Sequence, residues 1–222
     1  MKTYLKRVLV MFLSIAAALA LSAPGAWAQV KVACIGDSIT FGYGLANPGT
    51  QSYPAQLQAL LGSGYVVGNF GVNGATVQKG TAKSYWRTSQ YRNSKAFAPN
   101  VVVIMLGTND SKSSNWDAAK FNTDYRALIA DYWSLATQPE VFVCLIPPVY
   151  SPNAFGPTFD PVFIQNTVVP AIRTIASQTG MPLIDNNSPL LNHPEYFSDG
   201  VHPNAQGAGI IASTVAAAVT AP

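Results

Sequence analysis

Residues 32–40 read Val32-Ala33-Cys34-Ile35-Gly36-Asp37-Ser38-Ile39-Thr40. The apolar residues before the glycine predict a buried strand that ends at the glycine. Sites in open α/β sheets form past the carboxyl ends of the strands, so the serine is a candidate nucleophile. Gly-Asp-Ser is also typical of a turn, because glycine tolerates unusual φ and Asp or Ser caps a following helix. The stretch alone leaves both interpretations open.

Segments with strand and helix patterns alternate along the rest of the chain. The strand candidates are Val30 to Ile35, Tyr65 to Phe70, Val101 to Leu106, Val141 to Ile146 and Pro182 to Ile184. The helix candidates are residues 53–61, 89–97, 118–135, 161–179 and 205–219. This alternation predicts a parallel sheet covered on both faces, with right-handed crossovers. No repeat or linker divides the chain, so we expect one domain over residues 29–222.

The first 28 residues predict a signal peptide. Three basic residues precede the apolar run 8–21, and Ala26-Trp27-Ala28 has the small-x-small pattern of a cleavage site. The run is short for a membrane span, and the helix-breaking pair Pro24-Gly25 follows it. We therefore expect an exported protein, periplasmic or secreted, with no membrane anchor after cleavage.

The charge of the chain is concentrated in this segment. It holds three of the thirteen basic residues and none of the ten acidic ones, so the remainder is formally neutral. Neutrality argues against nucleic acid or an anionic membrane as a partner, because both attract basic proteins. The oligomeric state cannot be inferred from these patterns.

The cysteines and histidines do not predict a metal or cofactor site. No Cys-x-x-Cys or His-x-x-x-His spacing occurs, and no Gly-x-Gly-x-x-Gly or phosphate loop follows a strand. Cys34 and Cys144 are the two cysteines, and an exported chain with an even count invites a disulfide. Both lie in predicted buried strands, and a bridge needs Cα atoms within about 7 Å. A strand between them would prevent a bridge, so we favour two buried free thiols.

Polar clusters follow the second and third predicted strands and precede the last helix. Gly71 and Gly74 leave backbone N–H groups accessible, as an oxyanion requires, although a glycine-rich turn explains them as well. Asn109 could donate its amide in the same crevice or cap a helix. Asp199 stands three residues before His202, so its carboxylate can orient the imidazole as a serine-activating base requires. The other histidine, His193, has no acidic residue shortly before it and is interpreted as a packing or surface residue.

Taken together, the clusters resemble the blocks of the SGNH hydrolases, also called GDSL esterases and lipases. The blocks, in the family's order, are Gly36-Asp37-Ser38, Asn69-Phe70-Gly71 with Gly74, Gly107-Thr108-Asn109-Asp110, and Asp199-Gly200-Val201-His202-Pro203. Ile39 stands where the family name has leucine. The resemblance implies a flavodoxin-like three-layer α/β/α sandwich with a five-stranded parallel sheet in the order 2-1-3-4-5. In that order the third strand separates the strands of Cys34 and Cys144.

The resemblance also implies a role for each residue of the blocks. Ser38 would be the nucleophile, His202 the general base and then acid, and Asp199 the group that orients His202. The Ser38 N–H, the Gly74 N–H and the Asn109 side chain would form the oxyanion hole. No cofactor or metal is implied. Asp37 and Asp110 are interpreted as structural carboxylates that hold the loops.

Further segments resemble the exported sialate O-acetylesterase-like or xylan acetylesterase-like branch of this family. They are residues 107–112 with Trp116, Ser84-Tyr85-Trp86, and residues 199–204. The resemblance predicts removal of O-acetyl groups from carbohydrate. The substrate would be a small-molecule or glycan ester.

Two alternative functions remain open. A short-chain esterase, thioesterase or lysophospholipase would fit if Tyr85, Trp86 and the loop 147–150 with Tyr150 form an apolar trough. In either kind of enzyme, these three aromatic residues are the candidate substrate-binding residues, and residues 79–93 could be a surface loop or a wall of the site. A non-catalytic glycan-binding module that keeps the fold is the more remote alternative.

Overall fold

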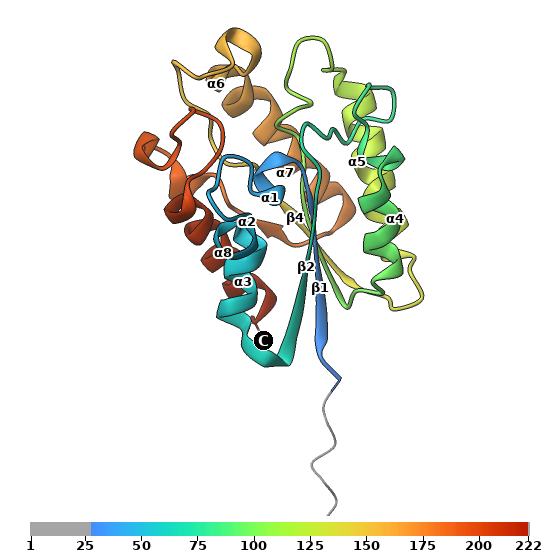
Figure 1. The fold of residues 1–222 in the computed structure, drawn as a ribbon. Coiled ribbons are helices and arrows are strands. Elements are labelled where there is room, and N and C mark those ends of the chain that lie inside the picture. The colour runs from blue at the N-terminus through green and yellow to red at the C-terminus, as the bar shows by residue number, and fades with distance from the viewer. Residues whose placement is uncertain (1–27, 222) are drawn as a thin grey trace, which may run out of the picture.

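The structure, a computed structural model, describes residues 28–221 and contains a five-stranded parallel sheet in the order β2-β1-β3-β4-β5 (Figure 1). The strands are β1 (Val30–Gly36), β2 (Tyr65–Gly71), β3 (Val101–Met105), β4 (Glu140–Cys144) and β5 (Leu183–Ile184). The predicted sheet type and strand order are confirmed, and each strand lies within two residues of its predicted bounds. The predicted signal peptide, except for Ala28, lies outside the described residues.

Eight α-helices surround the sheet in the part of the chain that the structure describes. They are α1 (Ser38–Phe41), α2 (Pro48–Gln51), α3 (Tyr53–Leu61), α4 (Ser89–Ala96), α5 (Ala118–Trp133), α6 (Pro161–Phe163), α7 (Val169–Thr179) and α8 (Ala205–Val219). The helix predicted over residues 161–179 contains a π-helical segment, Ile164–Val168, between α6 and α7. Pro170 has no N–H to donate, so the regular hydrogen-bond ladder cannot pass through this region unchanged.

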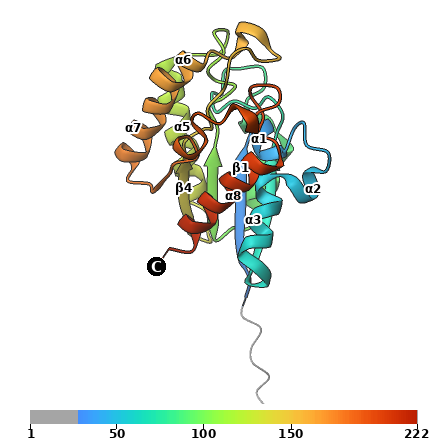
Figure 2. The same cartoon turned by 90° about the vertical axis from the view of Figure 1, so that its left-hand side faces the viewer.

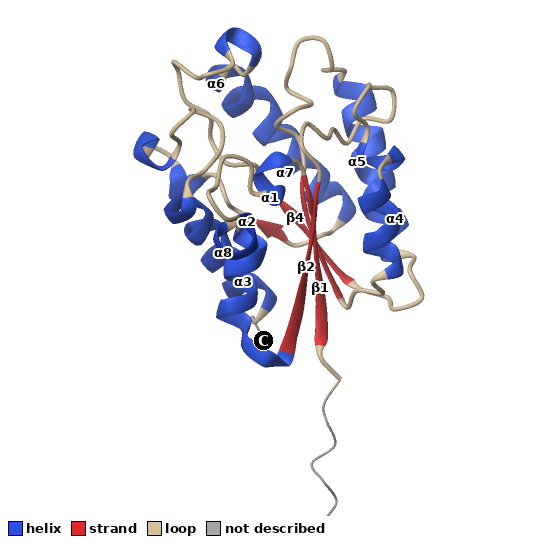
Figure 3. Cartoon of the chain, in the orientation of Figure 1, coloured by secondary structure: helices blue, strands red, loops and turns tan. Residues whose placement is uncertain are grey.

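Helices cover both faces of the sheet. Helices α3 and α8 pack together on one side, whereas α4 and α5 lie on the other (Figures 1 and 2). Helix α7 contacts both α5 and β4. Figure 3 shows that the strands run between these layers toward a set of long loops at one edge of the sheet. Within residues 28–221, no helix has the length and apolarity needed to cross a membrane.

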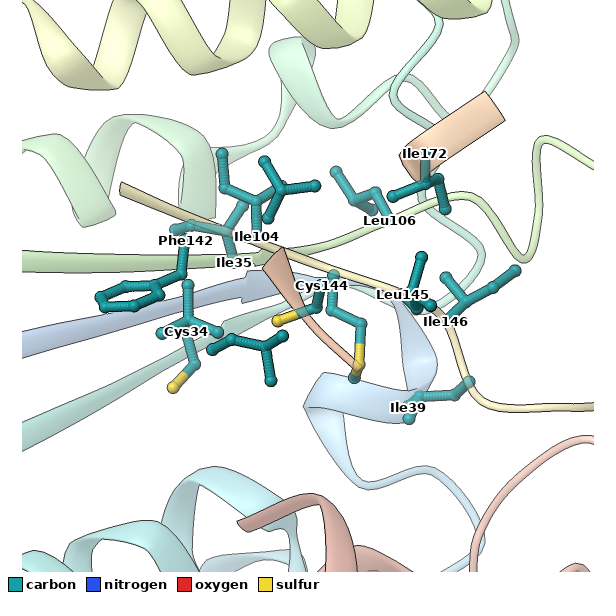
Figure 4. Close-up of a cluster of buried hydrophobic side chains, with 14 of the residues drawn as sticks. Cys34, Ile35, Ile39, Ile104, Leu106, Phe142, Cys144, Leu145, Ile146 and Ile172 are labelled. Atoms are coloured by element: carbon teal, nitrogen blue, oxygen red, sulfur yellow. The ribbon is translucent and has the colours of Figure 1, made fainter. Parts of the chain in front are cut away.

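The central strands are buried on both faces, as their continuous apolar runs predict. Residues Val32–Ile35 of β1 and all of β3 carry side chains with less than a tenth of their surface exposed. Cys34 and Cys144 lie in this core among isoleucine and leucine side chains (Figure 4). Strand β3 lies between β1 and β4, and both thiols are free.

Candidate active site

The end of β1 places Ser38 at the carboxyl edge of the sheet. Asp37 caps the short helix α1 by accepting the Ile39 N–H at 2.9 Å, and Ser38 is the first residue of that helix. A Cβ atom at Gly36 would overlap the Thr40 side chain and lie 2.8 Å from the Met105 carbonyl oxygen of β3. The turn from strand to helix therefore requires glycine at this position.

A continuous line of hydrogen bonds joins Ser38, His202 and Asp199. His202 Nε2 lies 2.9 Å from Ser38 Oγ, and His202 Nδ1 lies 2.6 Å from Asp199 Oδ2. The other carboxylate oxygen of Asp199 accepts the backbone N–H groups of Val201 at 2.9 Å and His202 at 2.7 Å. The loop before α8 thus folds back on itself and holds the imidazole with one nitrogen toward the serine.

The hydrogen bonds in this loop keep Asp199 ionised. Partial burial raises the pKa of Asp199, but bonds from the backbone N–H and side chain of His202 and from the Val201 N–H outweigh it. The net pKa lies below the usual value of an aspartate. An anionic carboxylate next to Nδ1 stabilises the imidazolium that forms when Nε2 accepts a proton.

Two further polar groups face the same cavity as Ser38. Gly74 has φ +81°, in the left-handed region that favours glycine, and the Lys83 side chain lies against the position that a Cβ would take. The Asn109 side chain is 3% exposed, and its Nδ2 lies 3.4 Å from Asp37 Oδ2. Asn115 donates to the Asn109 carbonyl oxygen at 2.8 Å. The structure therefore brings Ser38, Gly74 and Asn109 together at one cavity.

Asp37 and Asp110 hold the loops beneath this cavity, so the interpretation of both as structural carboxylates is confirmed. Asp110 accepts the backbone N–H groups of Val77 at 3.0 Å and Gln78 at 3.1 Å, which ties the loop after β3 to the loop after β2. Burial raises the pKa of Asp110 to about 6 despite these bonds. Burial raises the pKa of Asp37 to about 7; the Ile39 N–H opposes this, and the nearby charge of Asp110 adds to it.

The cavity above Ser38 has a volume of about 200 Å³. Its lining comes from five separate segments of the chain and comprises Ser38, Tyr43, Asn73, Gly74, Lys83, Thr108, Asn109, Lys112, Phe155, Phe159, Val201 and His202. Sequence reasoning did not single out Tyr43, Phe155 or Phe159 as site residues. Lys83 lies in residues 79–93, for which a wall of the site was one of the two interpretations. Lys112 was part of the resemblance in residues 107–112, but no role was inferred for it.

Two exposed aromatic rings flank His202. The Tyr43 ring centroid lies 4.6 Å from that of His202, and the Phe155 ring centroid lies 5.6 Å away. Tyr43 is 46% exposed and Phe155 is 37% exposed. A second hollow of about 350 Å³ lies beside Tyr43 and His202, and Asp199 and Asn204 also line it. The structure thus places two solvent-open aromatic faces next to His202.

The structure places the three aromatic residues expected to bind substrate away from the cavity over Ser38. Tyr85 is fully buried and donates its hydroxyl to the Phe70 carbonyl oxygen at 2.9 Å. Trp86 donates its indole N–H to the Val77 carbonyl oxygen at 2.9 Å. The Tyr150 hydroxyl donates to the Leu190 carbonyl oxygen and accepts the His193 N–H at 3.1 Å. Each of the three polar groups thus bonds to backbone atoms outside the cavity, that of Tyr85 to strand β2 and those of Trp86 and Tyr150 to loops.

The remaining histidine lies outside the site, as interpreted from the sequence. The side chain of His193 is 46% exposed, and its Nδ1 pairs with Glu195 at 2.7 Å. Within residues 28–221, no three His, Cys, Asp or Glu side chains are grouped as ligands of a metal ion.

A serine, a histidine and an aspartate joined in this way at the carboxyl edge of a parallel sheet are the arrangement of the serine hydrolases. Residues 34–210 match the model of the GDSL-like lipase/acylhydrolase family, so the chain belongs to that family. The family resemblance in the sequence blocks is thereby confirmed.

Among curated proteins, the chain is similar to an acetylxylan esterase from Xylanibacter ruminicola. The two are 34% identical over 209 residues, which cover 86% of this chain but 43% of that relative. The chain therefore spans less than half the length of this relative.

Solved structures show the same fold. A putative arylesterase from Agrobacterium tumefaciens matches with a TM-score of 0.69 at 24% identity, covering 86% of this chain and 98% of that one. A carbohydrate acetylesterase from Sinorhizobium meliloti matches with a TM-score of 0.69 at 22% identity, with the same coverage.

Proposed function

We propose that this chain is a serine ester hydrolase that removes O-acetyl groups from carbohydrate by an acyl-enzyme mechanism. The observation that carries the proposal is the hydrogen-bonded line from Ser38 through His202 to Asp199, which opens into a small cavity. A serine is a weak nucleophile until a base accepts its proton, and His202 Nε2 is within reach to do so.

In the first step, Ser38 Oγ attacks the ester carbonyl carbon while its proton passes to His202 Nε2. The carbonyl oxygen becomes an oxyanion, and we assign its stabilisation to the Ser38 N–H, the Gly74 N–H and the Asn109 amide, which belong to residues that line the same cavity. Protonated His202 then donates to the departing sugar oxygen as the bond from carbon to that oxygen breaks. The acetyl group remains on Ser38.

In the second step, water repeats the attack. His202 Nε2 takes a proton from the water, the hydroxide adds to the acetyl carbon, and the bond to Ser38 Oγ breaks. The proton on His202 returns to Ser38, so the enzyme is regenerated and acetate leaves. Asp199 remains ionised throughout and holds the imidazole in orientation.

The size and lining of the cavity favour a short acyl group. Its volume of about 200 Å³ is below the range of about 300–1,000 Å³ found in pockets that bury drug-sized ligands. Two lysines, two asparagines and a threonine interrupt its apolar wall, so a long acyl chain would meet polar groups along its length. An acetyl group needs little apolar surface.

The similarity to an acetylxylan esterase supports carbohydrate as the alcohol part of the ester. The exposed rings of Tyr43 and Phe155 beside His202 support the same choice, since sugar rings pack on aromatic faces. If the predicted signal peptide operates, the enzyme would meet such polymers outside the cytoplasm.

The test is turnover of 4-nitrophenyl esters from acetate to laurate beside acetate release from acetylated xylan, with Ser38→Ala as the blank. We expect a rate that collapses beyond butyrate, and acetate release that the blank lacks. Activity maintained to laurate with no acetate from xylan would replace the proposal with a lipid esterase or thioesterase. Fluorophosphonate labelling of neither the wild type nor Ser38→Ala would point to a binding module.

A further inference from the structure

Two lysine side chains line the cavity over Ser38, and no carboxylate lines it. Lys83 comes from the loop between β2 and α4, and Lys112 comes from the loop after β3. They therefore reach the same cavity from different segments. Among the ion pairs of residues 28–221, neither lysine has a carboxylate partner. Two ammonium groups without a counter-ion thus face the space that the substrate must enter.

The position of Lys83 places its charge close to the reacting group. Its Nζ lies 3.1 Å, and its Cδ 2.8 Å, from the point that a Cβ on Gly74 would occupy. The Gly74 N–H is one of the two backbone N–H groups proposed to bind the oxyanion; the other is the Ser38 N–H. An anion bound by Lys83 would therefore lie within a few ångströms of the ester carbonyl.

Lys112 lines the same cavity, and its Nζ lies 4.8 Å from the centroid of the Phe159 ring, which also lines it. Burial and the positive charge of Lys83 both lower the pKa of Lys112, and Asp37 opposes this. Because both lysines line one small cavity, their like charges repel each other. A group with negative charge between them would remove that repulsion.

The surrounding carboxylates do not already supply this negative charge. Asp37 is 1% exposed beneath the cavity floor, and burial raises its pKa to about 7, so it is only partly ionised at neutral pH. Asp110 bonds to the backbone of Val77 and Gln78. Asp199 bonds to His202 and borders the other hollow.

We propose that Lys83 and Lys112 form an anion-binding subsite, and that the preferred substrate is an acetylated sugar that carries a carboxylate. This inference rests on the proposed acetylesterase function and narrows its substrate class. The carboxylate belongs to the sugar, because an acetyl group is uncharged. Ammonium groups form charge-assisted hydrogen bonds with carboxylates, which are stronger than those between neutral groups.

The test compares two substrates that differ in one group. They are the acetylated methyl glucuronide and the acetylated methyl glucoside, which carry a carboxylate and a hydroxymethyl group, respectively, at C5. The measured quantity is the ratio of kcat/KM for the glucuronide to kcat/KM for the glucoside. We expect the wild type to prefer the glucuronide by about tenfold or more, as one charge-assisted hydrogen bond would give.

Variants assign this preference to the two lysines. Lys83→Met and Lys112→Met should each lower the ratio about tenfold or to near one, whereas Lys83→Arg should retain most of it. The matched control is Lys31→Met, at the amino end of β1 and so at the edge of the sheet opposite the site. It removes the same charge from the protein but should keep the wild-type ratio. Raising the salt concentration from about 0.02 M to about 0.5 M should also reduce the preference.

A wild-type ratio near one, or a ratio that survives in the Lys83→Met, Lys112→Met double variant, would overturn the subsite. Equal losses on both sugars in the variants would instead give the lysines a role in stabilising the oxyanion, which also overturns it. If neither sugar ester is hydrolysed, the proposed function fails, and the subsite is tested by binding alone. Saturation-transfer NMR with methyl glucuronide should then give a signal that methyl glucoside and the double variant lack; equal signals would reject the subsite.

Discussion

His202 Nε2 and Ser38 Oγ lie 2.9 Å apart although 164 residues separate them in the chain. The end of β1 supplies the serine and the loop before α8 supplies the histidine. Because both segments lie at the same edge of the sheet, the fold brings the two side chains into contact.

This contact predicts the effect of removing the base. His202→Ala should lower kcat for 4-nitrophenyl acetate by roughly 10⁴–10⁶-fold, since Ser38 would lose its proton acceptor. The protein should stay folded, because the ring, although only 9% exposed, packs against the exposed rings of Tyr43 and Phe155 rather than in the sheet core. The control is His193→Ala, which removes an exposed imidazole outside the site. Comparable activity in both variants would remove His202 from the mechanism.

Asn109→Ala tests the oxyanion hole. Loss of one donor should reduce kcat by roughly 10²–10³-fold with little change in KM, because the missing hydrogen bond forms mainly in the transition state. Steady-state kinetics on 4-nitrophenyl acetate measure both constants. Asn93→Ala, on the exposed surface of α4, is the matched control. A near wild-type kcat for Asn109→Ala would show that this amide does not contact the oxyanion.

The two buried carboxyl groups predict how stability depends on pH. An aspartate in the unfolded chain titrates near about pH 3.9. Burial raises the pKa of Asp37 to about 7 and that of Asp110 to about 6. Between about pH 3.9 and these raised pKa values, the folded protein therefore binds more protons than the unfolded chain. Their contribution to stability is complete at low pH and is lost as the pH rises through about 6 and 7.

The free energy of unfolding should therefore fall between about pH 5 and about pH 8, and Asp37→Asn should reduce that fall. Urea denaturation of wild type and variant at both pH values measures the difference. Asn at this position retains the oxygen that accepts the Ile39 N–H. An identical pH dependence in wild type and Asp37→Asn would contradict the raised pKa of Asp37.

Gly36→Ala tests the turn that carries the nucleophile. The new methyl group would overlap Thr40 and press on the Met105 carbonyl oxygen, so the end of β1 must shift. We expect a loss of about 1–3 kcal/mol in the free energy of unfolding and a large loss of activity. Gly64→Ala is the matched control, because a Cβ there meets no atom within 4 Å, and it should change stability by less than about 0.5 kcal/mol. Equal stability of the two variants would mean that the turn tolerates a side chain.

Much of the fold could be predicted from local patterns. The apolar runs in the central strands β1, β3 and β4 are continuous because helices cover both faces, and that continuity separates them from the helices with spaced apolar residues. The π-helical segment before Pro170 escaped prediction, because residues 161–179 keep a helical pattern throughout. Helices α1 and α2 have four residues each, too few for a periodic signal.

The sequence by itself determined the groups whose geometry is local. Asp199 and His202 are three residues apart, so one turn of the loop is enough to join them, and Ser38 follows β1 directly. Tertiary structure alone decided which aromatic and charged side chains face the cavity. Tyr85 is buried and Tyr43 is exposed, while Lys83 and Lys112 line one cavity from different loops. The physical reason is that exposure and proximity depend on how the strand order assembles distant loops, and no local pattern of residues encodes that assembly.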